Sequence, residues 1–226
     1  MELTDWEATE KGTPQGGVIS PLLANIYLDA LDWKMQSLGF EMVRYADDMV
    51  VLCRTKEEAQ TALERLREWM EEAELTLHPD KTKLTDMSEP RAMFEFFGYR
   101  FERSRKGRLN RFIRKKSLLK LRDSIRYKTP RNNGHSMETI IKRVNVTLQG
   151  TYGYFKHVHP SQLEEIDRWV RGRLRAIKRK RRGLRGRGRG TDHQRWPNRY
   201  FSELGLFSLL EAKNAELLSL RNGANS

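Results

Sequence analysis

The sequence has little of what a disulfide-rich or membrane-embedded protein requires. Its 226 residues include one cysteine, Cys53, so no internal disulfide can form, and a solitary thiol suits a reducing, cytoplasmic compartment. We find no run of about 18 apolar residues, the length that a membrane-spanning helix needs. The composition of 38% hydrophobic and 32% charged residues, with a mean hydropathy of −0.76, predicts a soluble chain that can still form a core.

Acidic residues are scarce in the second half of the chain. Residues 101–200 hold 7 Asp/Glu against 30 Lys/Arg, whereas residues 1–100 hold 20 against 11. The net charge of +13 therefore arises from one segment, and such a segment attracts a polyanion whatever its fold. Because this segment has few apolar anchors, nucleic acid is favoured over a membrane surface as its partner.

Two helices are predicted in the first half from their capping residues. Ser20 is the expected N-cap of the first helix, and Pro21 suits its first position because the missing N–H costs nothing there. Thr55 and Glu58 form a capping box before the apolar stripe of the second helix.

Strands are predicted between and after these helices. Residues 41–46 and 49–54 have the composition of two strands joined by a tight turn. A short strand, a turn and another strand are expected over 75–87. Residues 93–101 have the composition of one strand, and a turn at 106–107 is expected to lead from it into a partner strand.

The second half is predicted to be helical and basic. Helices are expected over 115–128, 136–158 and 161–182, and the last begins with a capping box of Ser161 and Glu164. Together with the first half, this predicts an α+β fold followed by an all-α part. The predicted domains are the α+β part, the helical part, and a basic linker with a C-terminal docking tail: 1–112, 113–183 and 184–226.

Asp47 and Asp48 stand side by side between two apolar strands. An exposed hairpin turn is the ordinary interpretation of two adjacent aspartates. The flanking strands are too apolar for that, and paired carboxylates at the edge of a buried sheet suit hard cations such as Mg²⁺. The sequence therefore predicts a metal-binding turn, of the kind that can hold two Mg²⁺ ions for phosphoryl transfer.

Four ordered motifs resemble those of the reverse transcriptase encoded by group II introns. They are GTPQGGVISPLLANIYL, RYADDMVVL, LHPDKTKL and FEFFGYRF, and the segment VNVTLQGTYGYFKHV…IDRWVRGRLRAIKRKRR is similar to the maturase, or thumb, region of the same proteins. The resemblance covers roughly residues 9–205. It implies a partial polymerase palm, with a ferredoxin-like antiparallel sheet and helices, followed by an all-α basic thumb/maturase domain.

The resemblance also implies roles for the matched residues. Asp47 would bind both Mg²⁺ ions, with Asp48 as a secondary acidic contributor. Lys81 would stabilise charge or donate a proton near the pyrophosphate, although a solvated turn lysine is the alternative. The residues that would contact nucleotide and template are Pro14, Gln15, Gly16, Tyr45 and Ala46. The residues that would form the primer grip are Phe97, Gly98 and Tyr99, although alternating aromatic residues also suit a core.

A dense group of cations in the last predicted helix would bind RNA, because guanidinium groups pair well with phosphates. Its members are Arg168, Arg171, Arg173, Arg175, Lys178, Arg179, Lys180, Arg181 and Arg182. The implied partners are intron RNA, an RNA template with a DNA primer, and dNTPs.

A polymerase palm also uses an aspartate from a strand upstream of these motifs. Asp5 does not follow an apolar strand, and Asp29 and Asp32 belong to the first helix, so none matches. We therefore expect the chain to be the C-terminal portion of a reverse transcriptase, active with a separate N-terminal fragment. A non-catalytic maturase-like module that assists RNA folding and splicing is the alternative, and a functionless remnant also remains open.

Overall fold

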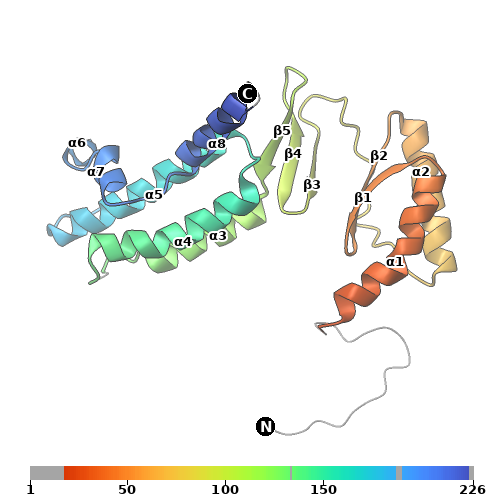
Figure 1. Cartoon of the computed structure of the whole chain (residues 1–226), viewed down its shortest axis with the longest axis horizontal. Helices are drawn as coiled ribbons and strands as arrows, with labels where there is room; N and C mark the ends of the chain where they lie inside the picture. The colour runs from red at the N-terminus through yellow and green to blue at the C-terminus, as the bar shows by residue number, and fades with distance from the viewer. Residues whose placement is uncertain (1–17, 133, 187–189, 224–226) are drawn as a thin grey trace, which may run out of the picture. The chain divides into compact units, whose positions relative to one another are not determined.

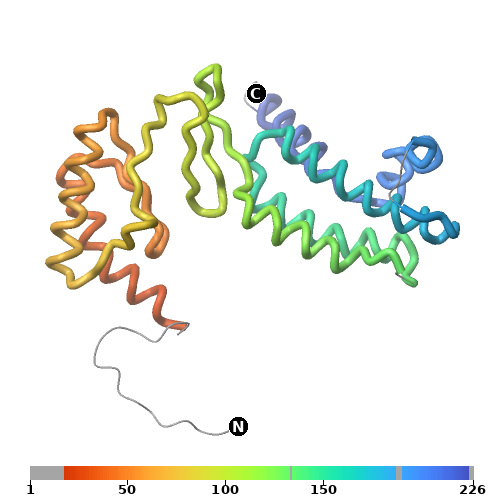
Figure 2. The backbone as a smooth tube through the Cα atoms, turned by 180° about the vertical axis from the view of Figure 1, so that it is seen from behind, coloured from red at the N-terminus to blue at the C-terminus, as the bar shows by residue number. Residues whose placement is uncertain are grey.

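The computed structural model describes residues 18–132, 134–186 and 190–223. The chain divides into two compact units, Met1–Met87 and Ser88–Ser226, which Figures 1 and 2 show from opposite sides. Both contain helices and small antiparallel sheets, which confirms the α+β class. Among the described residues, no helix has the length and apolarity needed to cross a membrane. The division into domains 1–112, 113–183 and 184–226 stays a prediction.

The first unit is a two-stranded hairpin covered on one face by two helices. Its elements in chain order are α1 (Ser20–Ser37), β1 (Glu41–Tyr45), β2 (Asp48–Leu52) and α2 (Lys56–Glu72). The two helices meet the inner face of the hairpin through buried residues at helical spacing. These are Leu28, Leu31, Met35, Ala62, Leu66 and Met70.

The two predicted helix starts are found close to where the sequence puts them. The Glu58 N–H donates to Thr55 Oγ1 at 3.1 Å, and the Glu58 carboxylate accepts from the Arg54 N–H at 2.6 Å. This confirms Thr55 as an N-cap, although Glu58 reaches back one residue further than a capping box requires. The first helix begins at Ser20 itself with Ile19 as its N-cap, one residue earlier than predicted.

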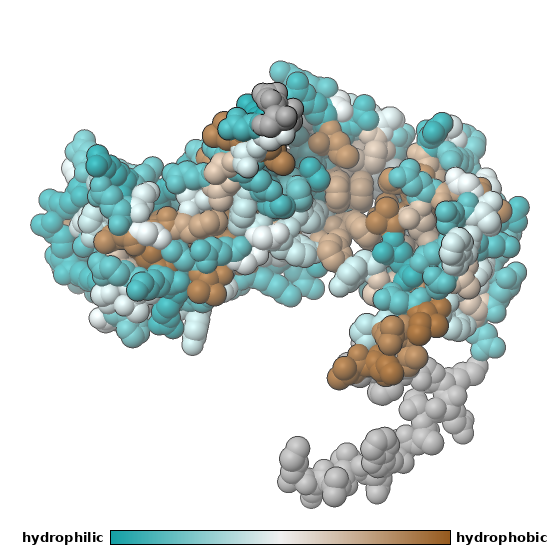
Figure 3. Space-filling model, viewed as in Figure 1, coloured by the Kyte–Doolittle hydropathy of each residue, from teal (hydrophilic) through white to brown (hydrophobic). Residues whose placement is uncertain are grey.

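A group of apolar residues of the first unit faces solvent. Near the start of α1, a group of apolar side chains is exposed (Figure 3), and its members are Val18, Ile19, Leu22, Leu23 and Ile26.

Residues 75–87, all of them described, form no strand, so the strand pair predicted there is wrong. A strand needs a neighbour to accept its backbone hydrogen bonds, and this segment pairs with none in the described part of the unit.

The second unit begins with a three-stranded antiparallel sheet in the order β3 (Met93–Phe96), β4 (Tyr99–Arg103), β5 (Leu109–Ile113). The predicted turn before β5 is confirmed, with Gly107 at a φ of +78°. The single strand predicted over 93–101 is wrong, because Phe97 and Gly98 form a two-residue turn inside it. Their φ angles of +51° and +80° have the signs of a type I′ turn.

Six helices follow the sheet among the described residues. They are α3 (Lys115–Lys128), α4 (Met137–Phe155), α5 (Pro160–Arg181), α6 (Thr191–Arg195), α7 (Asn198–Glu203) and α8 (Leu209–Gly223). The first three confirm the helices predicted from the sequence. The Ser161/Glu164 capping box is wrong, because the N-cap of α5 is His159, two residues before Ser161, and its side chain accepts from the Ser161 N–H at 3.3 Å.

The core of the second unit is formed by α3, α4 and α5, with α8 lying along α5 (Figure 1). The apolar tail was expected to dock on something, and it docks on this core. Trp196, Phe201 and Leu209 are buried there.

A buried carboxylate on α5 fixes the start of α8. Asp167 is 3% exposed, and its carboxylate accepts from the backbone N–H groups of Leu209 at 3.0 Å and Leu210 at 3.1 Å. It also accepts from the Ser208 hydroxyl at 2.8 Å. The two backbone N–H groups are among those that a helix start leaves without an intrahelical partner. Asp167 therefore acts as an N-cap for a helix about 40 residues further along the chain.

Replacing Asp167 by alanine should lower the free energy of unfolding by about 2–4 kcal/mol, because three donors then lose a charged acceptor in a buried position. Urea denaturation of the variant and of the wild type measures this difference. Asp123→Ala is the matched control, because Asp123 forms an exposed pair with Arg126 on α3, and it should cost less than about 1 kcal/mol. Equal costs for the two variants would contradict the capping role.

Candidate active site and nucleic-acid interface

The paired aspartates lie at the turn between β1 and β2. Tyr45 pairs with Asp48, so the turn itself consists of Ala46 and Asp47. Ala46 has a φ of +52°, a conformation that is costly for a residue with a Cβ. Asp47 stands exposed in the turn, and Asp48 is the exposed first residue of β2. The hairpin thus presents two adjacent carboxylates to solvent at one end, and the expectation that its strands are too apolar for an exposed turn is wrong, because one face of the hairpin is also exposed.

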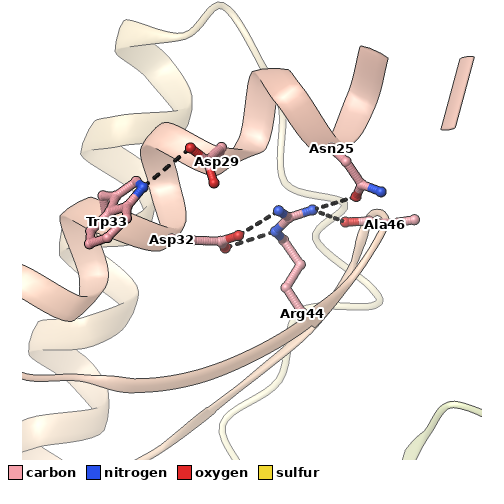
Figure 4. Close-up of polar contacts among 6 residues, drawn as sticks. All are labelled: Asn25, Asp29, Asp32, Trp33, Arg44 and Ala46. Carbon is pink, nitrogen blue, oxygen red and sulfur yellow. Dashed lines mark hydrogen bonds and ion pairs between the residues drawn. The ribbon is translucent and has the colours of Figure 1, made fainter. Parts of the chain in front are cut away.

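Arg44 fixes this turn to α1 (Figure 4). Its guanidinium donates to both Asp32 oxygens, at 2.8 Å from Nε and 2.5 Å from Nη2. Nη1 donates to the Asn25 side chain and to the Ala46 carbonyl, both at 3.0 Å. The Arg44 side chain is 9% exposed, and its hydrogen bonds to Asp32 raise its pKa. One buried cation therefore joins two helix residues to the backbone beside Asp47.

The two aspartates of α1, Asp29 and Asp32, each have a hydrogen-bond partner. Asp32 is held by Arg44, and Asp29 accepts from the Trp33 indole N–H at 3.2 Å. Neither aspartate matches the expected metal ligand, and the role of Asp32 in holding Arg44 is not predicted from the sequence. The available signal was an arginine directly before Tyr-Ala-Asp-Asp, at a strand position that alternation directs toward the helices.

The turn suits Mg²⁺ in its ligand chemistry. Asp47 and Asp48 offer hard oxygen ligands, and Mg²⁺ is usually bound by one or two carboxylates while water and substrate phosphates complete its octahedron. Among the described residues, no group of three or more His, Cys, Asp or Glu side chains gathers in a way that could hold a metal ion. A metal at this turn would therefore depend on ligands beyond those side chains.

The remaining predicted site residues lie in several places. Tyr45 is exposed on the outer face of β1, and Lys81 is exposed in a turn where its N–H donates to the His78 carbonyl at 3.1 Å. Pro14, Gln15 and Gly16 lie outside the described residues. The predicted primer-grip residues, Phe97, Gly98 and Tyr99, belong to the second unit, at the turn between β3 and β4.

The cations predicted to bind RNA differ in how much of them faces solvent. The exposed members are Arg168, Lys180, Arg181 and Arg182, and the half-buried members are Arg171, Arg173, Lys178 and Arg179. Arg175 is 2% exposed and donates to the Trp196 carbonyl at 2.9 Å and to Asn198 Oδ1 at 2.8 Å. Arg175 therefore holds the tail in place, and we leave it out of the proposed RNA contacts.

Positive charge also converges around Trp169 on α5. The guanidinium carbons of Arg122, Arg126 and Arg173 lie 5.8, 5.9 and 5.8 Å from the centre of its ring. Burial, and then the nearby charges of Arg126 and Arg131, lower the pKa of Arg173. Among the described residues, Arg173 pairs with no carboxylate; it donates to the Thr129 hydroxyl and carbonyl at 2.7 and 2.6 Å. Arg122 and Arg126 also pair with Glu165 and Asp123, so Arg173 is the member of this group whose charge favours an anionic partner beside α3 and α5.

A hairpin with paired aspartates in one unit and a cation-rich helical bundle in the other are typical of proteins that process nucleic acid. Residues 2–101 match the family described as reverse transcriptase (RNA-dependent DNA polymerase). Residues 118–196 match the maturase-specific domain of group II introns. The chain therefore belongs to the group II intron-encoded reverse transcriptases/maturases.

Two curated proteins are similar to parts of this chain. A retrovirus-related Pol polyprotein from the type-1 retrotransposable element R2 of Nasonia vitripennis is 33% identical over 84 residues, which are 34% of this chain and 8% of that protein. Protein YkfC of Escherichia coli (strain K12) is 29% identical over 136 residues, 44% of this chain and 35% of that protein. The chain thus spans well under two thirds of either relative.

Replacing Arg44 by methionine should destabilise the first unit by about 1–3 kcal/mol, because Asp32, a carboxylate that is partly exposed, then loses the charged donor of its hydrogen bonds. Amide hydrogen exchange of the β1–β2 hairpin measures the local opening free energy. Arg65→Met is the control, since Arg65 forms an exposed pair with Glu68 on α2 and should change exchange little. A hairpin equally protected in both variants would show that Arg44 does not hold the turn.

Proposed function

We propose that this chain contributes to an RNA-directed DNA polymerase of the group II intron type, in which the Asp47–Asp48 turn binds catalytic Mg²⁺. The observation that carries the proposal is the exposed Asp47 in a Tyr-Ala-Asp-Asp turn that Arg44 anchors, within the segment that matches reverse transcriptases. The chain covers a small share of its curated relatives, so polymerase activity, substrates and partners are all part of the proposal.

In this function, bound Mg²⁺ supplies activation of a primer 3′-hydroxyl and stabilisation of the leaving pyrophosphate. Asp47 holds the metal from the tip of the turn, and Asp48 adds negative charge from the first position of β2. Arg44 keeps the turn in place without neutralising Asp47, because its guanidinium is occupied by Asp32, Asn25 and the Ala46 carbonyl. Lys81 is proposed to balance charge on the substrate phosphates.

The basic helices of the second unit are proposed to hold the RNA. Phosphate contacts by lysine and arginine supply affinity without regard to base sequence. The exposed cations of α5 and the arginines around Trp169 offer such contacts from one bundle. The proposed substrates are an RNA template with a DNA primer, and dNTPs.

Asp47→Ala should lower primer extension on an RNA template by at least about a hundredfold. The reason is that the Mg²⁺ that stabilises the developing charge would lose a carboxylate ligand. Chelation of Mg²⁺ should have the same effect on the wild type. The assay uses the full chain, alone and with an added N-terminal reverse transcriptase fragment, the partner that the sequence predicts. Glu41→Ala is the control, since Glu41 is an exposed carboxylate at the other end of the same hairpin. Absence of wild-type extension in both arms, or equal activity of the two variants, would overturn the polymerase function.

A second candidate function is that of a maturase-like RNA-binding module. It is favoured by the match of residues 118–196 to the maturase-specific domain and by the cation-rich α5 within it. This function does not need Asp47. It therefore predicts that Asp47→Ala binds intron RNA as tightly as the wild type does.

Replacing the exposed cations Arg168, Lys180 and Arg182 together by glutamine should weaken RNA binding at least about tenfold. It should also make the slope of log K against log salt shallower by about 2. Each phosphate contact that is lost reduces the number of counterions that RNA binding releases. Filter binding across a salt series measures both. The control removes the same charge from the first unit, by Lys34, Lys56 and Arg67→Gln. RNA affinity that is unchanged in the α5 variant would exclude this helix as the RNA contact.

A further inference from the structure

The turn between β3 and β4 is attached to the C-terminal end of α4 by two tyrosine hydroxyls. The Tyr154 hydroxyl donates to the Phe97 carbonyl at 2.9 Å. In return, the Tyr99 hydroxyl donates to the Tyr154 carbonyl. Each element thus supplies one hydroxyl donor and one backbone acceptor to the other. We call this pair of contacts the tyrosine clamp.

Packing and a backbone contact reinforce the tyrosine clamp. The ring centres of Tyr99 and Tyr154 are 6.0 Å apart, and those of Tyr99 and Phe155 are 5.1 Å apart. The Arg114 N–H donates to the Gly98 carbonyl at 3.0 Å. A Cβ on Gly98 would lie 3.5 Å from the Phe155 ring, and its φ of +80° strains any other residue. The turn therefore lies directly against the helices.

The clamp also explains how Phe97 keeps an unfavourable backbone. Its φ of +51° costs of order 1 kcal/mol or more for a non-glycine residue, and such a conformation persists where surrounding contacts fix it. Burial, and then the neighbouring Tyr154, raise the pKa of the Tyr99 phenol. Its hydroxyl therefore stays protonated, and able to donate, at any pH below its ordinary pKa near 10.

The clamp joins two segments that belong to different matched families. Phe97 and Tyr99 lie in the segment that matches reverse transcriptases, and Tyr154 lies in the segment that matches the maturase-specific domain. Further contacts join β5 to the N-cap and the first turn of α5. The His159 N–H donates to the Arg111 carbonyl at 2.7 Å, and the Ile113 N–H donates to Gln162 Oε1 at 2.6 Å. The sheet and the helical bundle belong to the same compact unit.

We propose that Tyr154 is a positioning residue that locks the predicted primer-grip turn to the RNA-binding helices, so that one rigid body holds the primer and its RNA template. This inference rests on the proposed polymerase function, because it takes Phe97, Gly98 and Tyr99 as the primer grip. Loss of the Tyr154 hydroxyl leaves the hairpin and the helices folded but lets the turn shift against α4. Retention of an RNA/DNA primer duplex then suffers, whereas binding of RNA alone does not.

The test compares Tyr154→Phe with the wild type in the full chain. Tyr127→Phe is the control, because Tyr127 lies on α3 of the same unit, is 81% exposed, and its hydroxyl has no hydrogen bond to the described residues. Amide exchange at Arg114, whose N–H reaches the turn, reports the clamp itself. Release of a labelled RNA/DNA primer duplex into competitor, without dNTPs, reports the function. Titration with the RNA strand alone reports the helical surface.

Tyr154→Phe should speed exchange at Arg114 about fivefold and shorten the duplex lifetime about fivefold, the factor expected for one lost hydrogen bond. Its affinity for RNA alone should stay within about twofold of the wild type, and Tyr127→Phe should match the wild type throughout. Unchanged exchange at Arg114 would overturn the clamp. Faster exchange with an unchanged duplex lifetime would overturn its role in positioning, as would an equal loss of affinity for RNA alone.

The same measurements separate this inference from the proposed function. A wild-type chain that holds the duplex no longer than RNA alone would overturn the assignment of Phe97, Gly98 and Tyr99 as a primer grip, and with it the positioning role of Tyr154. This holds even if exchange at Arg114 showed that the tyrosine clamp is present. A duplex that is held well by both the wild type and Tyr154→Phe leaves the polymerase function standing and overturns only the positioning role.

Discussion

The first unit depends on where the Arg44 guanidinium places its hydrogen bonds. It satisfies Asp32 with two donors, and it uses a third to hold the Asn25 side chain and the Ala46 carbonyl. Without this cation, Asp32 would lose its counter-ion, and the Ala46 carbonyl would lose the hydrogen bond to Arg44. The pair does not have to add stability in total, since ion pairs of low exposure often break even. What it supplies is one defined position for the backbone next to Asp47.

The second unit uses polar side chains for the same purpose over longer distances. Asp167 caps α8, Arg175 holds the Trp196 carbonyl, and Tyr154 holds the Phe97 carbonyl. In each case a side chain on a long helix binds the backbone of a segment that is short or irregular. Apolar contacts draw these segments onto the core without fixing their register, whereas directional hydrogen bonds do fix it. The hydrogen bonds of these side chains therefore fix the predicted primer-grip turn and the tail relative to the helices.

Features set by local pattern were predictable, and features set by distant partners were not. The Thr55 cap and the helices predicted over 115–128 and 136–158 follow from neighbouring residues, and they were found, although the second of these helices ends at Phe155. The turn at Phe97-Gly98 was missed because five aromatic residues within 94–101 resemble a single strand, although a following glycine was a usable signal. At the candidate site, the motif directs attention to Asp47, but nothing local reveals that Arg44 and Asp32 meet across 12 residues.

The tertiary cap at Asp167 has a consequence for where this protein can be divided. The maturase-specific match ends at residue 196, yet Phe201 and Leu209 beyond it are buried in the same core as α4 and α5. A fragment cut at the family boundary would expose that core and leave Asp167 as a buried acceptor without its donors. The segment that matches the family and the segment that folds as one core therefore end at different residues. A fragment made for study should include the whole core.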